Sequence, residues 1–168
     1  MIDLTLKRLL SCVGFLLLQI LLLNNIKFLG FVTPYLYVYF ILLLPSSVSK
    51  EMTLLWGFLL GLAMDIFCDT LGCNAFATTF VAFLKPYFQN LFGPKDDFDD
   101  MKPSIERFGF NMFIQYVAYL VLIHHLMFFL IEAFTLSAFW YALLKAICCS
   151  MFTLLLILCF EYFKTRRR

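Results

Sequence analysis

Six ionisable side chains lie within or beside long apolar runs of this chain and are the first candidates for chemistry: Asp65, Asp69, His124, His125, Glu132 and Lys145. A charge in the hydrocarbon region is costly, so such residues face protein or internal water and commonly mark binding sites or proton pathways. Counted along the expected helices at about 1.5 Å per residue, the six fall in one buried polar layer in the outer half of the membrane. This layer predicts either a polar pocket or proton-linked site open to the outside, or groups that satisfy one another.

The type of each ionisable side chain limits the role that it could have. Lys145 is predicted to be the ion-pair partner of an acidic residue, and either histidine ring also has the reach to approach the outer headgroups. His124, His125 and Glu132 have metal-binding side chains, but adjacent histidines on a helix point about 100° apart. The chain has neither a His-Glu-x-x-His nor a Gly-x-Ser-x-Gly motif. We therefore predict no catalytic residue, metal or cofactor, and keep an intramembrane metal-dependent hydrolase as an alternative hypothesis.

Two glycines precede Asp65 on the same face of a predicted helix. Gly57, Gly61, Asp65 and Asp69 are spaced four residues apart, so they share one face of a helix. Glycines at this spacing let a second helix backbone approach closely inside a membrane. Two interpretations stay open: this face packs within its own bundle, or it contacts the membrane span of a partner protein.

The composition predicts the elements that must position these groups. With 63% hydrophobic residues and a mean hydropathy of +0.91 over 168 residues, the chain is expected to be an all-α polytopic membrane protein with one membrane domain, 1–168. The second apolar run is too short for a lone crossing helix, and Pro34 is a candidate break in it. The first run is expected to stay uncleaved because no small-residue cleavage site follows it. About six transmembrane helices are predicted: 9–23, 28–44, 52–68, 74–91, 110–131 and 138–160.

The basic residues predict the orientation. Lys50, the polar loop 93–108 and the basic tail 164–168 fall on one side of a six-span layout, whereas the opposite loops hold only Lys27. The positive-inside rule then places both termini in the cytoplasm. An acidic cluster at 96–100 lacks the glycine and terminal glutamate of an EF-hand, so we interpret it as part of a solvated cytoplasmic loop. Because the basic residues lie at the ends and in loops, we expect no nucleic-acid partner.

The order and spacing of several short motifs resemble a known family. The run from Pro34 to Pro45, the Gly57-x-x-x-Gly61-x-x-x-Asp65 stripe and the Leu71-Gly72 turn together resemble the rod shape-determining membrane proteins of the MreD family. The resemblance extends over nearly the whole chain, including its length and six-span layout, and departs from the family pattern at the acidic loop 93–107. The best-matched residues are Pro34, Pro45, Gly57, Gly61, Asp65 and Gly72.

This resemblance implies a non-catalytic inner-membrane subunit of the bacterial cell-elongation machinery. MreC is its main expected partner, with RodA, a class B penicillin-binding protein and the actin-like MreB as further members of the complex, surrounded by membrane lipid. Such a subunit maintains rod shape by scaffolding lateral peptidoglycan synthesis. The implied fold is similar to the substrate-binding subunits of energy-coupling-factor transporters. The alternative is a subunit that binds a small molecule or lipid in an outward-facing polar pocket around Asp65.

Overall fold

The computed structural model describes residues 2–28, 30, 32–94, 102–133 and 139–166. These residues contain no β-strand; a single antiparallel bridge joins Phe28 to Val32. The helices are, in chain order, α1 (Ile2–Leu21), the 3-10 helix η1 (Leu23–Asn25), α2 (Val38–Leu42), α3 (Lys50–Cys68), α4 (Cys73–Phe92), α5 (Ile105–Phe108), α6 (Phe110–Ala133) and α7 (Phe139–Arg166).

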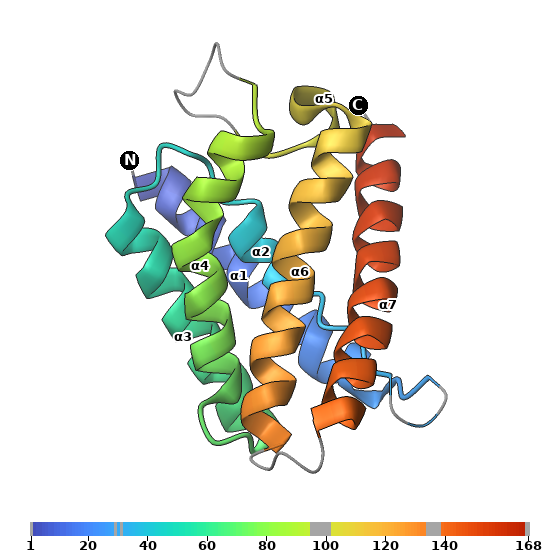
Figure 1. Cartoon of the computed structure of the whole chain (residues 1–168). Helices are drawn as coiled ribbons and strands as arrows, with labels where there is room; N and C mark the ends of the chain where they lie inside the picture. Colours follow the sequence, from blue (N-terminus) through green and yellow to red (C-terminus); the bar gives the residue numbers. More distant parts are fainter. Residues whose placement is uncertain (1, 29, 31, 95–101, 134–138, 167–168) are drawn as a thin grey trace.

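Four long helices form a row in which α3 packs against α4, α4 against α6, and α6 against α7 (Figure 1). Helix α1 runs obliquely across this row, and the short α2 contacts α1, α3, α4 and α6. The start of α1 and the end of α7 lie at the same end of the bundle as α5, which we call the terminal end. The turn between α3 and α4 lies at the opposite end, which we call the hairpin end.

Four segments are long and apolar enough to cross a membrane: Thr5–Asn25, Lys50–Cys68, Phe110–Ala133 and Phe139–Lys164. Large apolar side chains such as Leu10, Phe58 and Met151 are exposed on the outside of the bundle, as expected for a surface that faces lipid. Helix α4 has a comparable length but carries Lys85 and Gln89, among other polar residues, on its buried face. These observations confirm an all-α membrane-embedded protein.

The predicted span 28–44 is not a continuous helix, and the break suggested at Pro34 is present. Only the five residues of α2 are α-helical there, and the residues from Tyr37 to Leu42 are almost completely buried. Proline explains the break, because Pro34 has no backbone N–H to donate and its ring pushes Thr33 away from helical geometry. Pro45 follows the end of α2, and its carbonyl accepts a hydrogen bond from Val48 N at 3.2 Å. Residues 34–45, which we call the core segment, are apolar because they lie in the core of the bundle.

Polar side chains of the neighbouring helices satisfy this non-helical backbone. Gln19 of α1 donates to the Pro34 carbonyl at 2.8 Å and accepts from Leu36 N at 2.8 Å. Thr153 of α7 accepts from Tyr35 N at 3.0 Å. Irregular backbone at membrane depth is tolerated only where protein groups pair its N–H and C=O groups. Gln19 and Thr153 therefore hold the chain at 34–37 between α1 and α7.

The predicted cytoplasmic loop 93–108 is described only in part, because residues 95–101 lie outside the described residues. The described part ends in α5, where Ser104 Oγ accepts a hydrogen bond from Arg107 N at 3.3 Å. Such a serine N-cap satisfies a backbone donor that a short helix leaves open.

Candidate functional site

The glycine face of α3 packs against α4 of the same chain. A Cβ atom built on Gly61 would lie 2.6 Å from Ala75 Cα and 2.6 Å from the Asn74 carbonyl oxygen. At Gly57 it would lie 2.9 Å from Ala82 Cβ. Both glycines are buried. This is the small-residue packing of two membrane helices. Gly57 and Gly61 therefore lie inside the α3–α4 hairpin, where a partner protein cannot contact them.

Asp65 continues this face and caps the start of α4. Gly72, the residue before α4, has no side chain to act as a cap and adopts φ +83°. In its place, the Asp65 carboxylate accepts from the backbone N–H of Asn74 at 2.9 Å and of Ala75 at 2.8 Å. It also accepts from Thr70 Oγ1 at 2.6 Å and from Asn74 Nδ2 at 3.1 Å. Four donors and the positive end of a helix offset the burial of this carboxylate.

His124 joins the same network through Tyr37. The Tyr37 hydroxyl donates to Asn74 Oδ1 at 2.7 Å, and its oxygen lies 2.9 Å from His124 Nε2. Since the tyrosine proton points to Asn74, His124 Nε2 carries a proton and donates. His124 Nδ1 is then a bare acceptor, and it is buried without a hydrogen-bond partner. The chain His124–Tyr37–Asn74–Asp65 therefore links α6, the core segment, α4 and α3.

His125 points to a different set of partners. Its Nδ1 lies 2.7 Å from the Val121 carbonyl and so must donate to it. Its Nε2 then accepts from Thr153 Oγ1 at 3.4 Å, the same hydroxyl that receives Tyr35 N. The ring of Tyr35 packs edge-on against His125 with centroids 5.3 Å apart. His125 thus fixes α6 and α7 to the core segment.

We expect Tyr37→Phe to lower the free energy of unfolding by about 1–3 kcal/mol, because it leaves Asn74 Oδ1 and the His124 N–H short of a buried partner. Detergent-solubilised protein titrated with sodium dodecyl sulfate and followed by tryptophan fluorescence measures this loss. The matched control is Tyr87→Phe, which removes the same hydroxyl from an exposed ring and should change stability by less than about 0.5 kcal/mol. Equal effects of the two substitutions would contradict the network.

The remaining candidate residues do not belong to this network. Lys145 forms an ion pair with Glu132 at 3.2 Å, as predicted for an acidic partner, and its ammonium lies 4.5 Å from the centre of the Phe129 ring. Asp69 ends α3 in the left-handed conformation, with φ 54°. Asp69 and Glu132 are exposed and Lys145 is only partly buried, so of the six residues predicted to form one buried layer, only Asp65, His124 and His125 are buried. The positions of Asp69 and Glu132 at helix ends take them out of the core.

Lys145 instead lines a small cavity of about 200 Å³ together with Lys27, Thr33, Tyr35, Phe129 and Tyr141. Asp65 lines neither this cavity nor the larger one described below. Asp65 is buried and its carboxylate accepts four hydrogen bonds from protein groups, so these groups fill the place of the predicted pocket.

The polar network has a limited chemical repertoire. Its members hold fixed donors and acceptors, and the Asn74 amide interrupts any simple transfer of a proton from His124 to Asp65. No group of three His, Cys, Asp or Glu side chains in the described part of the chain is placed to hold a metal ion. The hydrogen bonds of the network join four segments of the chain, namely α3, α4, α6 and the core segment.

Sequence reasoning missed five residues that make the buried polar contacts: Tyr37, Asn74 and Thr78 in the network, and Gln19 and Thr153 at the core backbone. Gln19 and Thr153 were visible as single polar residues within apolar runs, which is a usable signal in a membrane protein. Tyr37 and Thr78 carry no such signal, because tyrosine and threonine are common in membrane helices.

No family model matches this chain, and no curated protein or solved structure matches it either.

Proposed function

We propose that this protein is a non-catalytic membrane subunit of the bacterial cell-elongation machinery, of the MreD type. One observation supports the sequence resemblance: its best-matched residues form one connected structural unit. Pro34 and Pro45 mark the two ends of the core segment. Gly57 and Gly61 pack against α4. Asp65 caps the start of α4, which follows Gly72. The matched positions thus have structural roles in the core segment and the α3–α4 hairpin, and this supports the proposal.

The proposal includes an orientation in the inner membrane. Lys7, Arg8, Lys102 and Lys164 line a common cavity, and the start of α1 and the end of α7, which carry three of them, lie at the terminal end of the bundle (Figure 1). Under the positive-inside rule this end faces the cytoplasm. In Figure 1 the chain runs away from this end along α1 and returns through the core segment to the start of α3. We therefore propose six crossings, with α2 in the second, and an architecture similar to energy-coupling-factor substrate-binding subunits.

The proposed partners are MreC, RodA, a class B penicillin-binding protein and MreB. Because Gly57 and Gly61 are occupied by α4, a partner span would contact another apolar face. Helix α1 is the least buried of the four candidate spans, with exposed Leu10, Leu17 and Leu21.

Purification of the tagged full-length protein from its native membrane, followed by mass spectrometry, tests this proposal. We expect enrichment of MreC, RodA or the penicillin-binding protein over a control membrane protein carrying the same tag at the same level. Recovery of transporter ATPases, with no cell-wall synthesis protein, would overturn the proposal.

The cavity of about 200 Å³ beside Lys145 favours a second candidate function, a small-molecule-binding membrane subunit. It is lined by two lysines and three aromatic rings, which suit a small anionic or aromatic ligand. A stoichiometric small molecule that co-purifies with the wild-type protein and is lost from Tyr141→Ala would support this alternative.

A further inference from the structure

A larger cavity, of about 520 Å³, opens at the terminal end of the bundle. Its walls come from α1, from the end of α2 and the turn after it, from the segment containing α5, and from α7. This volume lies within the range of pockets that hold small ligands. Of the site residues predicted from the sequence, only Pro45 lines this cavity.

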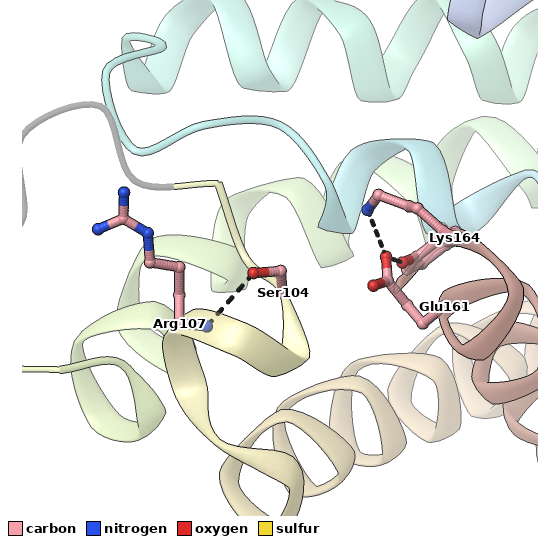
Figure 2. A network of polar contacts seen from close by, with 5 residues as sticks. Ser104, Arg107, Glu161 and Lys164 are labelled. Atoms are coloured by element: carbon pink, nitrogen blue, oxygen red, sulfur yellow. Dashed lines mark hydrogen bonds and ion pairs between the residues drawn. The ribbon is translucent and has the colours of Figure 1, made fainter. Parts of the chain in front are cut away.

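Basic side chains dominate the rim of this cavity: Lys7, Arg8, Lys102, Arg107 and Lys164. The acidic side chain among the described lining residues is Glu106. Lys164 is held in place by Glu161, at 2.6 Å, and Glu161 is itself buried and accepts a hydrogen bond from the Tyr39 hydroxyl. Figure 2 shows this Glu161–Lys164 pair beside the α5 turn that carries Ser104 and Arg107. Among the lining residues that the structure describes, basic side chains therefore outnumber acidic ones by five to one.

The inner wall of the cavity is apolar. It is formed by Phe15, Phe40, Leu43, Leu44 and Pro45. Phe40 and Leu44 belong to the main core cluster of the bundle, and the ring of Phe15 packs edge-on against Tyr39. A basic rim above an apolar wall is complementary to a molecule with an anionic head and a hydrocarbon tail. A phosphate compound without a tail would leave the apolar wall in contact with water.

The location matches the same kind of ligand. The ends of membrane helices lie at the depth of lipid headgroups, and basic pockets between such helices bind anionic lipid heads. We propose that this cavity binds the phosphate headgroup of an anionic phospholipid, with an acyl chain against its apolar wall. This site goes beyond the proposed role in cell elongation and does not depend on it.

Lipid binding by the purified full-length protein tests the proposal. We expect phosphatidylglycerol in mixed neutral-detergent micelles to bind at least about tenfold more tightly than phosphatidylcholine, as counted by native mass spectrometry. Each basic side chain near an anionic surface contributes about fivefold. The double substitution Lys7→Gln with Lys102→Gln should therefore weaken phosphatidylglycerol binding by roughly 25-fold. Both lysines are exposed, so the fold should survive.

The matched control removes two charges from the same end of the bundle but outside the cavity. Lys50→Gln with Arg166→Gln changes the net charge equally, and neither residue lines the cavity. We expect less than about a threefold effect. An equal loss of binding in both double variants would mean that general surface electrostatics, and not this cavity, attracts the lipid. That result would overturn the proposal.

A competition experiment separates a lipid from a soluble phosphate compound. Glycerol 3-phosphate carries the head without the chains, so at millimolar concentration it should not displace phosphatidylglycerol. Displacement at that concentration would overturn the lipid proposal in favour of a soluble ligand. If the double variant does not fold, the wild-type preference for phosphatidylglycerol and the single Lys102→Gln variant decide the question. Absence of any preference in the wild type overturns the proposal, whether or not cell-wall proteins co-purify.

Discussion

The Asp65→Asn substitution is expected to lower the free energy of unfolding by about 2–4 kcal/mol. The carboxylate receives four hydrogen bonds, two of them from the backbone of α4. An amide in its place presents an NH₂ group to at least one of these donors and carries no charge to interact with the start of α4. The loss is measured by titrating the detergent-solubilised protein with sodium dodecyl sulfate and following the fluorescence of its two tryptophans, Trp56 and Trp140.

Asp69→Asn is the matched control for this prediction. It removes the same charge four residues away, at an exposed position whose left-handed backbone asparagine also tolerates. We expect a change of less than about 0.5 kcal/mol. A stability loss at Asp69 equal to that at Asp65 would mean that net charge, and not capping of α4, controls stability.

The Gly61→Ala substitution is expected to cost about 3 kcal/mol. The added methyl group would lie 2.6 Å from two backbone atoms of α4, and backbone cannot rotate away as a side chain does. Helices α3 and α4 must therefore separate, which also lengthens the hydrogen bonds between Asp65 and α4. The same denaturant titration measures the loss, and cross-linking of cysteines introduced into the two helices reports their separation.

Gly14→Ala is the control for the glycine prediction. Gly14 lies in α1 with no atom within 4 Å of an added Cβ. Alanine there should stabilise the protein by about 0.5–1 kcal/mol, because glycine is the poorer helix former. Gly57→Ala should fall between the two, with a cost of about 1–2 kcal/mol, since its nearest atoms, Ala82 Cβ at 2.9 Å and the Thr78 carbonyl oxygen at 3.1 Å, are farther away than those at Gly61. A tolerated Gly61→Ala would contradict the close contact between α3 and α4.

The two predictions address one unit, the α3–α4 hairpin. Glycine packing sets the distance between the helices, and the Asp65 cap fixes where α4 begins. Because Asn74 forms hydrogen bonds with both Asp65 and Tyr37, a substitution that separates α3 from α4 should also weaken the hydrogen bond between α4 and the core segment. Double substitution of Gly61 and Asp65 is therefore expected to be less than additive.

Much of the fold was accessible from the amino-acid order. Long apolar runs predicted an all-α membrane protein, and helices α3, α4, α6 and α7 lie close to the runs 52–68, 74–91, 110–131 and 138–160. The four-residue spacing of Gly57, Gly61 and Asp65 placed them on one face, which the structure packs against α4. The pairing of Lys145 with an acidic side chain also followed, because an ammonium in an apolar helix needs a nearby carboxylate.

The path of the core segment could not be read from the amino-acid order. Hydropathy measures how apolar a segment is, and a segment buried among helices is as apolar as one that faces lipid. Hydropathy therefore could not show that residues 33–44 are mostly non-helical and that Gln19 and Thr153 pair their backbone. The cap on α4 could not be predicted for a related reason. The sequence shows that burying the Asp65 carboxylate in a membrane helix costs free energy. Only the tertiary structure shows that the backbone N–H groups of Asn74 and Ala75 offset this cost.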